Sequence, residues 1–171
     1  MPFLIFLIYV IVLGLAAHLI GEAIPRRWFL WWRFPYRPWR WERAGRIYER
    51  MGIRAWKDRL PDKSRVVKGM VPKRLGRCLS SETVFRLVRE TCLAEAVHLA
   101  LCLCVLPVGV WFAGEGGAFF AVVYILGNLP FIMIQRYNRP ALVSLGERLK
   151  KREERRKNAG ADPVGEYGGR S

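Results

Sequence analysis

The sequence predicts an all-α membrane protein with three transmembrane helices and additional amphipathic helices at the cytoplasmic interface. The 171-residue chain is 52% hydrophobic and yet carries a formal net charge of +15. Its apolar and basic residues form long alternating runs instead of mixing at the period of a soluble helix or strand. A bilayer imposes this segregation, because its core accepts apolar side chains and its surface attracts basic ones.

The first predicted span covers residues 3–20, where the only polar side chains are Tyr9 and His18. An apolar run of about 18 residues is long enough to cross the hydrocarbon core. A cleaved signal peptide is the alternative, but no basic residue precedes the run, and Glu22 soon follows it. We therefore expect residues 1–24 to be a transmembrane helix.

Residues 25–80 are predicted to form an aromatic and basic interfacial region. Over residues 25–41 arginines alternate with tryptophan, phenylalanine and tyrosine. Aromatic rings of this kind prefer the headgroup layer, and guanidinium groups pair with lipid phosphates. Pro35 and Pro38 make one continuous helix improbable there. Residues 42–60 place apolar side chains at roughly helical spacing, which predicts an amphipathic surface helix followed by a basic linker.

Residues 81–135 are predicted to be a transmembrane helical hairpin. The hydroxyl of Ser80 is placed to cap the first helix of the hairpin, and Pro107 is expected to kink it. The glycine-rich turn at 114–117 is too short for anything except a reversal, so the third span returns over residues 118–134.

The distribution of basic residues predicts the orientation. Lysine and arginine near span ends are retained on the cytoplasmic side. None precedes the first span and none lies in the 114–117 turn. We expect a multi-pass protein of the cell inner membrane with its amino terminus outside. Residues 136–171 form a basic cytoplasmic tail, disordered after about residue 157 because glycine, aspartate, proline and serine dominate there.

This topology brings polar side chains from all three spans to one depth, just beneath the cytoplasmic surface. They are His18 and Glu22 from the first span, Glu90, Glu95 and His98 from the second, and Asn128, Gln135, Arg136, Asn138 and Arg139 from the third and its exit. Ionisable groups inside a span are costly unless they are partnered, so they are expected to face protein or water.

Glu95 and His98 are three residues apart and therefore lie on one helix face. A carboxylate beside an imidazole raises its basicity, which suits a general base acting on a hydroxyl. Two structural interpretations also stay open. His98 could serve packing alone, or Glu95 could form an ion pair with Arg136 or Arg139, which follow the third span. The pairing of His18 with Glu22 is a weaker candidate because it lies at a helix end near water.

Other functional classes are disfavoured. The four cysteines lack the spacing of a disulfide framework or a metal site, and no nucleotide-binding loop is present. The basic surface is most simply an anchor to anionic lipid, although it would also attract a phosphate-bearing donor. A nucleic-acid role is disfavoured because the aromatic residues adjoin a span and no recognition motif follows.

The chain resembles the glycosyl-4,4'-diaponeurosporenoate acyltransferase family from about residue 25 to 145. The resemblance rests on the Glu-x-x-His element that ends at His98, on Asn128-Leu129-Pro130, on the run from Gln135 to Pro140, and on Trp41-Glu42-Arg43 through Trp56-Lys57-Asp58. Ala141 departs from the family pattern, which leads us to expect a basic residue at that position.

The resemblance implies transfer of a fatty acyl group to a sugar hydroxyl of a membrane glycolipid such as a glycosylated carotenoid. His98 would be the general base, Glu95 would orient it, and Asn128 would donate to the developing oxyanion. Substrate contacts would come from Lys57, Glu90, Gln135, Arg136, Asn138 and Arg139. Acyl-CoA or an acyl carrier protein would be the co-substrate, with no other cofactor and no metal, and an oligomer is compatible with this picture. The alternatives are a non-catalytic membrane scaffold and a small transporter.

Overall fold

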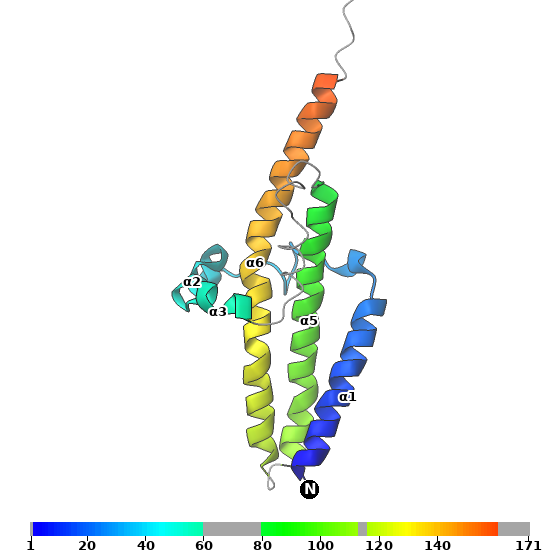
Figure 1. Ribbon diagram of the computed structural model, residues 1–171, viewed down its shortest axis with the longest axis vertical. Coiled ribbons are helices and arrows are strands. Elements are labelled where there is room, and N and C mark those ends of the chain that lie inside the picture. Colours follow the sequence, from blue (N-terminus) through cyan, green and yellow to red (C-terminus); the bar gives the residue numbers. More distant parts are fainter. Residues whose placement is uncertain (1, 60–79, 113–115, 161–171) are drawn as a thin grey trace, which may run out of the picture.

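The computed structural model describes residues 2–59, 80–112 and 116–160, and within these ranges every regular element is a helix. Three helices are long and apolar enough to cross a membrane: α1 (Pro2–Ala23), α5 (Ser81–Trp111) and α6 (Gly117–Gly160). This confirms the predicted fold class. Helices α5 and α6 lie side by side as an antiparallel pair, and α1 packs along the lower half of α5 (Figure 1).

Helix α1 contacts the hairpin mainly through its amino-terminal half. Phe6 stacks on Phe120 of α6 with ring centroids 5.5 Å apart, and the Tyr9 hydroxyl donates to the Cys104 carbonyl of α5 at 2.7 Å. Most of the remaining α1 side chains are exposed apolar groups, among them Leu4 and Leu15. Such a helix is suited to contact lipid on its outer faces, because lipid tails solvate apolar side chains.

The start of α5 agrees with the predicted cap, because the Ser80 hydroxyl accepts a hydrogen bond from the Thr83 backbone N–H at 3.2 Å. Pro107 lies inside α5, as expected. Near the turn the two hairpin helices approach closely: a Cβ added to Gly109 would lie 2.7 Å from the Cβ of Ala121. A small residue is therefore required at this crossing, as is common between membrane helices.

The interfacial region differs from the prediction of one amphipathic helix over residues 42–60. It consists of short pieces: η1 (Arg26–Trp28), η2 (Arg40–Gly45), α2 (Arg46–Arg50), α3 (Ile53–Trp56) and η3 (Lys57–Arg59). Gly45 and Gly52 adopt φ of +93° and +68°, which a continuous right-handed helix cannot contain. The apolar residues of the predicted pattern still face the protein, because Tyr48 and Ile53 are buried against Ile134 of α6.

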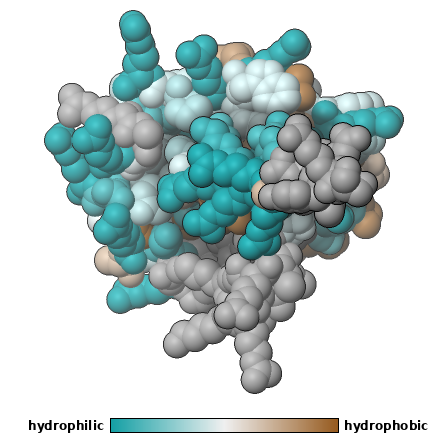
Figure 2. Space-filling view, turned by 90° about the horizontal axis from the view of Figure 1, so that it is seen from above, coloured by the Kyte–Doolittle hydropathy of each residue, from teal (hydrophilic) through white to brown (hydrophobic). Residues whose placement is uncertain are grey.

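Helix α6 continues without interruption from the membrane-spanning part into the basic tail, although it contains Pro130 and Pro140. Its extension is tied to the start of α5, because the Glu153 carboxylate accepts from the Ser81 backbone N–H and hydroxyl at 2.8 and 2.6 Å. Viewed from this end, the described surface is mainly hydrophilic, with apolar residues at the margin (Figure 2). The basic linker predicted to run to about Ser80 lies almost wholly outside the described residues. Disorder was predicted after about residue 157, but α6 continues to Gly160, and the residues after it lie outside the described ranges.

Candidate functional site

A histidine and an asparagine form a polar pair between α5 and α6. His98 Nδ1 lies 2.8 Å from Asn128 Oδ1, and Asn128 Nδ2 donates to the Tyr124 carbonyl, also at 2.8 Å. A carbonyl can only accept, so Asn128 must direct its NH₂ group at Tyr124 and its oxygen at His98. That oxygen in turn requires a proton on Nδ1, which leaves the lone pair of a neutral His98 on Nε2.

The His98 ring is held from one further side. It stacks on Phe131 with centroids 4.8 Å apart and an angle of 9° between the rings. Asn128 is buried, whereas His98 is only half-buried. The pair therefore presents a fixed, partly accessible imidazole whose basic nitrogen is opposite the anchored one. Such an imidazole can take a proton from a hydroxyl brought to Nε2.

A second cluster is a buried ion network centred on Glu95, three residues nearer the amino terminus of α5. One carboxylate oxygen of Glu95 accepts from Arg136 and the other from Arg139, each at 2.5 Å. Arg139 also donates to the hydroxyl and the carbonyl of Thr91, at 2.9 and 3.1 Å. Glu95 is 1% exposed and Arg139 is 2% exposed, so these charges are fully enclosed by protein.

Glu42 is the second carboxylate of the network. It is ion-paired with Arg136 and accepts from the Tyr48 hydroxyl at 2.7 Å and from the Trp39 backbone N–H at 2.9 Å. Burial opposes ionisation, but the hydrogen bonds from Arg136, Tyr48 and Trp39 outweigh it and lower the pKa of Glu42. Burial, together with the hydrogen bond to Glu42, raises the pKa of Tyr48 well above its usual value. Glu42 is therefore held as a carboxylate and Tyr48 as a neutral donor.

The same two arginines fix the backbone of the segment from Phe29 to Glu42, which we call the strap. Arg136 donates to the carbonyls of Pro35 and Arg37 at 3.0 and 3.4 Å, and Arg139 donates to the carbonyl of Tyr36 at 2.7 Å. Among the described residues, no buried side-chain nitrogen or oxygen lacks a hydrogen-bond partner. The network thus fastens the strap to the hairpin without leaving an unpaired buried charge.

The structure corrects two expectations about these residues. Glu95 was expected to orient His98, but both of its oxygens bind arginine, and Asn128 holds the imidazole instead. Asn128 was expected to donate to an oxyanion, but its NH₂ group is directed at the Tyr124 carbonyl. Helical spacing identifies neighbours on one face of one helix, whereas Glu95 and His98 of α5 take their partners from α6.

Arg136 and Arg139 were expected to bind the donor phosphate or the acceptor headgroup, but Arg136 is paired with Glu42 and Glu95, and Arg139 is paired with Glu95. The open structural reading, an ion pair between Glu95 and an exit arginine, is the arrangement found. A buried arginine with satisfied donors has little capacity to bind a further anion.

The remaining predicted residues have other positions and contacts. Glu90 pairs with Arg26 at 2.9 Å, and Lys57 lies over the Tyr137 ring, 4.8 Å from its centroid. Gln135 is buried and Asn138 is half-buried on α6. His18 is exposed on α1, and Glu22 contacts Arg26 at 3.4 Å. Arg26 thus joins the first span to the second.

Four network residues were missed as site residues by the sequence reasoning: Tyr36, Glu42, Tyr48 and Thr91. Glu42 carried a usable signal, since it is the only acidic residue between Pro25 and Tyr48 in a stretch rich in arginine. A single acid in such a stretch is a candidate for a buried ion pair. The tyrosines and Thr91 carry no comparable signal, because their roles depend on which helices meet. Within the described ranges, no three His, Cys, Asp or Glu side chains are grouped so that they could share a metal ion.

Comparison with known proteins identifies the family of this chain. The family described as glycosyl-4,4'-diaponeurosporenoate acyltransferase matches residues 25–148. The chain belongs to this family. It is 27% identical over 139 residues to the glycosyl-4,4'-diaponeurosporenoate acyltransferase of Staphylococcus aureus strain bovine RF122 / ET3-1, covering 80% of this chain and 82% of that protein. The protein of the same name from strain MRSA252 is 26% identical over equal shares.

No solved structure matches the chain significantly. Membership of the family makes this protein an acyltransferase and an enzyme, in agreement with the resemblance noted in the sequence. The region matched, residues 25–148, includes the strap, the ion network and the His98–Asn128 pair.

Proposed function

We propose that this protein is an integral membrane O-acyltransferase that moves a fatty acyl group from an acyl thioester to a hydroxyl of a membrane glycolipid. The relatives are named for a glycosylated carotenoid, diaponeurosporenoate, and an acceptor of that chemistry suits this chain. The observation that carries the proposal is the His98–Asn128 pair, which holds an imidazole between two apolar helices, with no hydrogen bond to Nε2 from any described residue.

The pair supports the following step. His98 Nε2 takes the proton of the acceptor hydroxyl while that oxygen attacks the thioester carbonyl carbon. The new carbon–oxygen bond forms the ester, the carbon–sulfur bond breaks, and the leaving thiolate receives the proton from His98. Asn128 acts on the ring only, because its oxygen binds the Nδ1 proton and stabilises the imidazolium that forms during the step.

The position of the pair suits a lipid acceptor. His98 lies within a helix apolar enough to span a membrane, and Asn128 precedes Arg136 by eight residues, about 12 Å along α6. The strap, rich in tryptophan and arginine, is fastened at the level of Arg136. In this proposal the strap lies in the cytoplasmic headgroup layer, so an acceptor sugar at that layer approaches His98 while its apolar chain stays among the lipid tails.

The test is a comparison of two histidine variants in membranes supplied with acyl-CoA and glycosylated carotenoid. His98→Ala should lower the rate of formation of the acylated, more apolar product by about 10²- to 10⁴-fold, the usual contribution of a general base. His18→Ala is the matched control, because the same residue type is lost from an exposed position on α1. It should retain activity.

A His98→Ala variant that accumulates normally and forms product at the wild-type rate would remove the assignment of His98. Failure of the wild-type protein to acylate any glycolipid from any thioester would instead favour the non-catalytic scaffold. Family membership disfavours that scaffold.

A further inference from the structure

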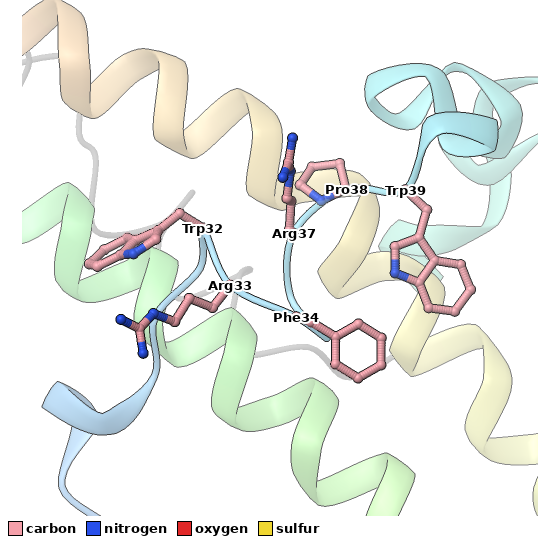
Figure 3. A pocket seen from close by; sticks show the side chains of 6 residues that line it. All are labelled: Trp32, Arg33, Phe34, Arg37, Pro38 and Trp39. Atoms are coloured by element: carbon pink, nitrogen blue, oxygen red, sulfur yellow. The ribbon is translucent and has the colours of Figure 1, made fainter.

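The strap forms a pocket of about 530 Å³ that lies apart from the His98–Asn128 pair. Six strap residues line it: Trp32, Arg33, Phe34, Arg37, Pro38 and Trp39. In Figure 3 all six come from one continuous stretch of backbone, with Arg37 and Pro38 between Trp32 on one side and Trp39 on the other. The pocket is therefore built from the interfacial segment itself.

Two of the lining residues leave positive charge at this pocket. The buried arginines Arg136 and Arg139 are neutralised by Glu42 and Glu95. Arg33 and Arg37 are exposed, and among the described residues neither guanidinium forms a hydrogen bond or ion pair. In Figure 3 the two guanidinium groups extend in different directions from the strap backbone, and the planar fork of each matches a phosphate group.

The lining also offers aromatic surface beside this charge. Trp32 and Phe34 remain 52% and 81% exposed, and Trp39 is 45% exposed. Arginine beside exposed ring faces suits a ligand that combines phosphate with a planar base, because bases stack on aromatic side chains. It also suits a phospholipid headgroup beside its glycerol and acyl chains. Phosphate is the chemistry common to both ligands.

The pocket backbone is held in place before any ligand binds. The carbonyls of Pro35, Tyr36 and Arg37 accept from the two buried arginines, and the Trp39 N–H is bound by Glu42. The Arg37 N–H donates to the Arg33 carbonyl at 2.9 Å, which closes a turn between the two exposed arginines. A preformed site binds more tightly because less freedom is lost on association.

We propose that the strap pocket is a phosphate-binding site, with Arg33 and Arg37 as its anion-binding residues. Its further assignment, to the nucleotide phosphates of an acyl-CoA donor, rests on the proposed function. The strap is fastened at Arg136, eight residues from Asn128 along α6. The pantetheine arm of coenzyme A is longer than this axial offset of about 12 Å.

The first experiment measures binding without turnover. Adenosine 3',5'-bisphosphate is titrated into the purified protein in neutral detergent, and dihexanoyl phosphatidylglycerol is titrated in a separate arm. The pocket variant Arg33→Gln/Arg37→Gln should weaken binding of the probe that occupies the pocket, the bisphosphate or the lipid, at least about tenfold. The reason is the loss of two charge-assisted contacts. The control Arg46→Gln/Arg50→Gln removes the same charge from exposed positions on α2 and should change binding less than threefold.

Variant-sensitive binding of the bisphosphate supports the site and its assignment to the donor. Variant-sensitive binding of the lipid alone supports the phosphate site and replaces the donor by a headgroup. Equal weakening by both double variants, or no binding of either probe, overturns the proposal. Because no acyl transfer is measured, these outcomes are independent of whether His98 is catalytic.

A second experiment separates the donor head from its reacting end. The KM for acyl-CoA should rise at least about tenfold in Arg33→Gln/Arg37→Gln, while the KM for an acyl-pantetheine that lacks the nucleotide should stay within threefold of wild type. An equal rise for both donors would overturn the assignment to the nucleotide.

Discussion

At the scale of single residues, Glu90 and Glu95 of α5 have different roles. Glu95 is buried and forms ion pairs with both Arg136 and Arg139. The Glu90 side chain is 33% exposed and pairs with Arg26, which also binds three backbone carbonyls and the Glu22 carboxylate. Removing one partner from a buried ion pair leaves an uncompensated charge, whereas exposed pairs contribute little.

We therefore expect Glu95→Ala to lower the free energy of unfolding by about 3–5 kcal/mol, because Arg139 loses the one carboxylate that it binds in the described part of the chain. Glu90→Ala should lower it by no more than about 1 kcal/mol. Thermal unfolding of the two variants in detergent measures the difference. Equal stability of both variants would contradict the structural role of Glu95.

Glu42 makes the fastening of the strap sensitive to acid. Its folded-state pKa lies below the ordinary value of 4.5 because Arg136, Tyr48 and Trp39 donate to it. The stabilisation from Glu42 is therefore present above about pH 4.5, and it is lost as pH falls through the folded-state pKa.

Glu42→Gln should be less stable than wild type at pH 7, and the stability difference should shrink as the pH falls from 5 toward 3. Tryptophan fluorescence during urea unfolding at each pH provides the measurement, with Glu49→Gln as a control in the neighbouring exposed ion pair to Arg54. A difference that is constant across this pH range would show that Glu42 is not held as a carboxylate.

At the scale of elements, the sequence predicted what depends on composition and missed what depends on backbone geometry. The three spans follow from long uncharged runs, and Ser80 as a cap follows from local chemistry. The amphipathic pattern over residues 42–60 could not reveal that Gly45 and Gly52 adopt positive φ. Apolar periodicity records which side chains face the protein, and two short helices at an angle satisfy it as well as one long helix.

The candidate site was predictable only in part for a related reason. The sequence placed His98 and Asn128 at one depth, and the structure joins them at 2.8 Å. It could not say whether Glu95 would bind His98 or an arginine, because that depends on the rotation of α5 against α6. The strap's part in the network was also hidden, since its carbonyls carry no residue-specific signal.

The crossing of α5 and α6 gives a prediction at this scale. In Gly109→Ala the new methyl group would meet the Ala121 Cβ at 2.7 Å, so the helices must separate and stability should fall by about 1–3 kcal/mol. Gly127→Ala is the control, because nothing lies within 4 Å of its added Cβ, and it should be neutral or stabilising. Thermal unfolding distinguishes them, and a Gly109→Ala variant as stable as Gly127→Ala would argue against the close crossing.

At the scale of the whole molecule, the described polar groups form two layers along the hairpin. The His98–Asn128 pair lies nearer the Trp111 end of α5, and the ion network with the strap lies nearer the basic end of α6. This order suits a protein whose basic end faces the cytoplasm, where lysine and arginine are retained.

That orientation predicts the behaviour of reporter fusions. A fluorescent protein fused after Ser171 should fluoresce, because it folds in the cytoplasm, and alkaline phosphatase fused there should be inactive. Alkaline phosphatase inserted in the 114–117 turn should be active. The reverse pattern would invert the proposed topology and place the strap on the outer face.

The link between Ser81 and Glu153 sets a lower limit on how far the protein can be shortened. The family match ends at residue 148, yet the carboxylate that binds the first amide of α5 comes from residue 153. A truncation chosen from the family boundary alone would remove the Glu153 carboxylate. The first turn of α5 would then lose a hydrogen-bond acceptor and would fray. The minimal stable unit therefore reaches at least one helical turn beyond the region that its relatives share.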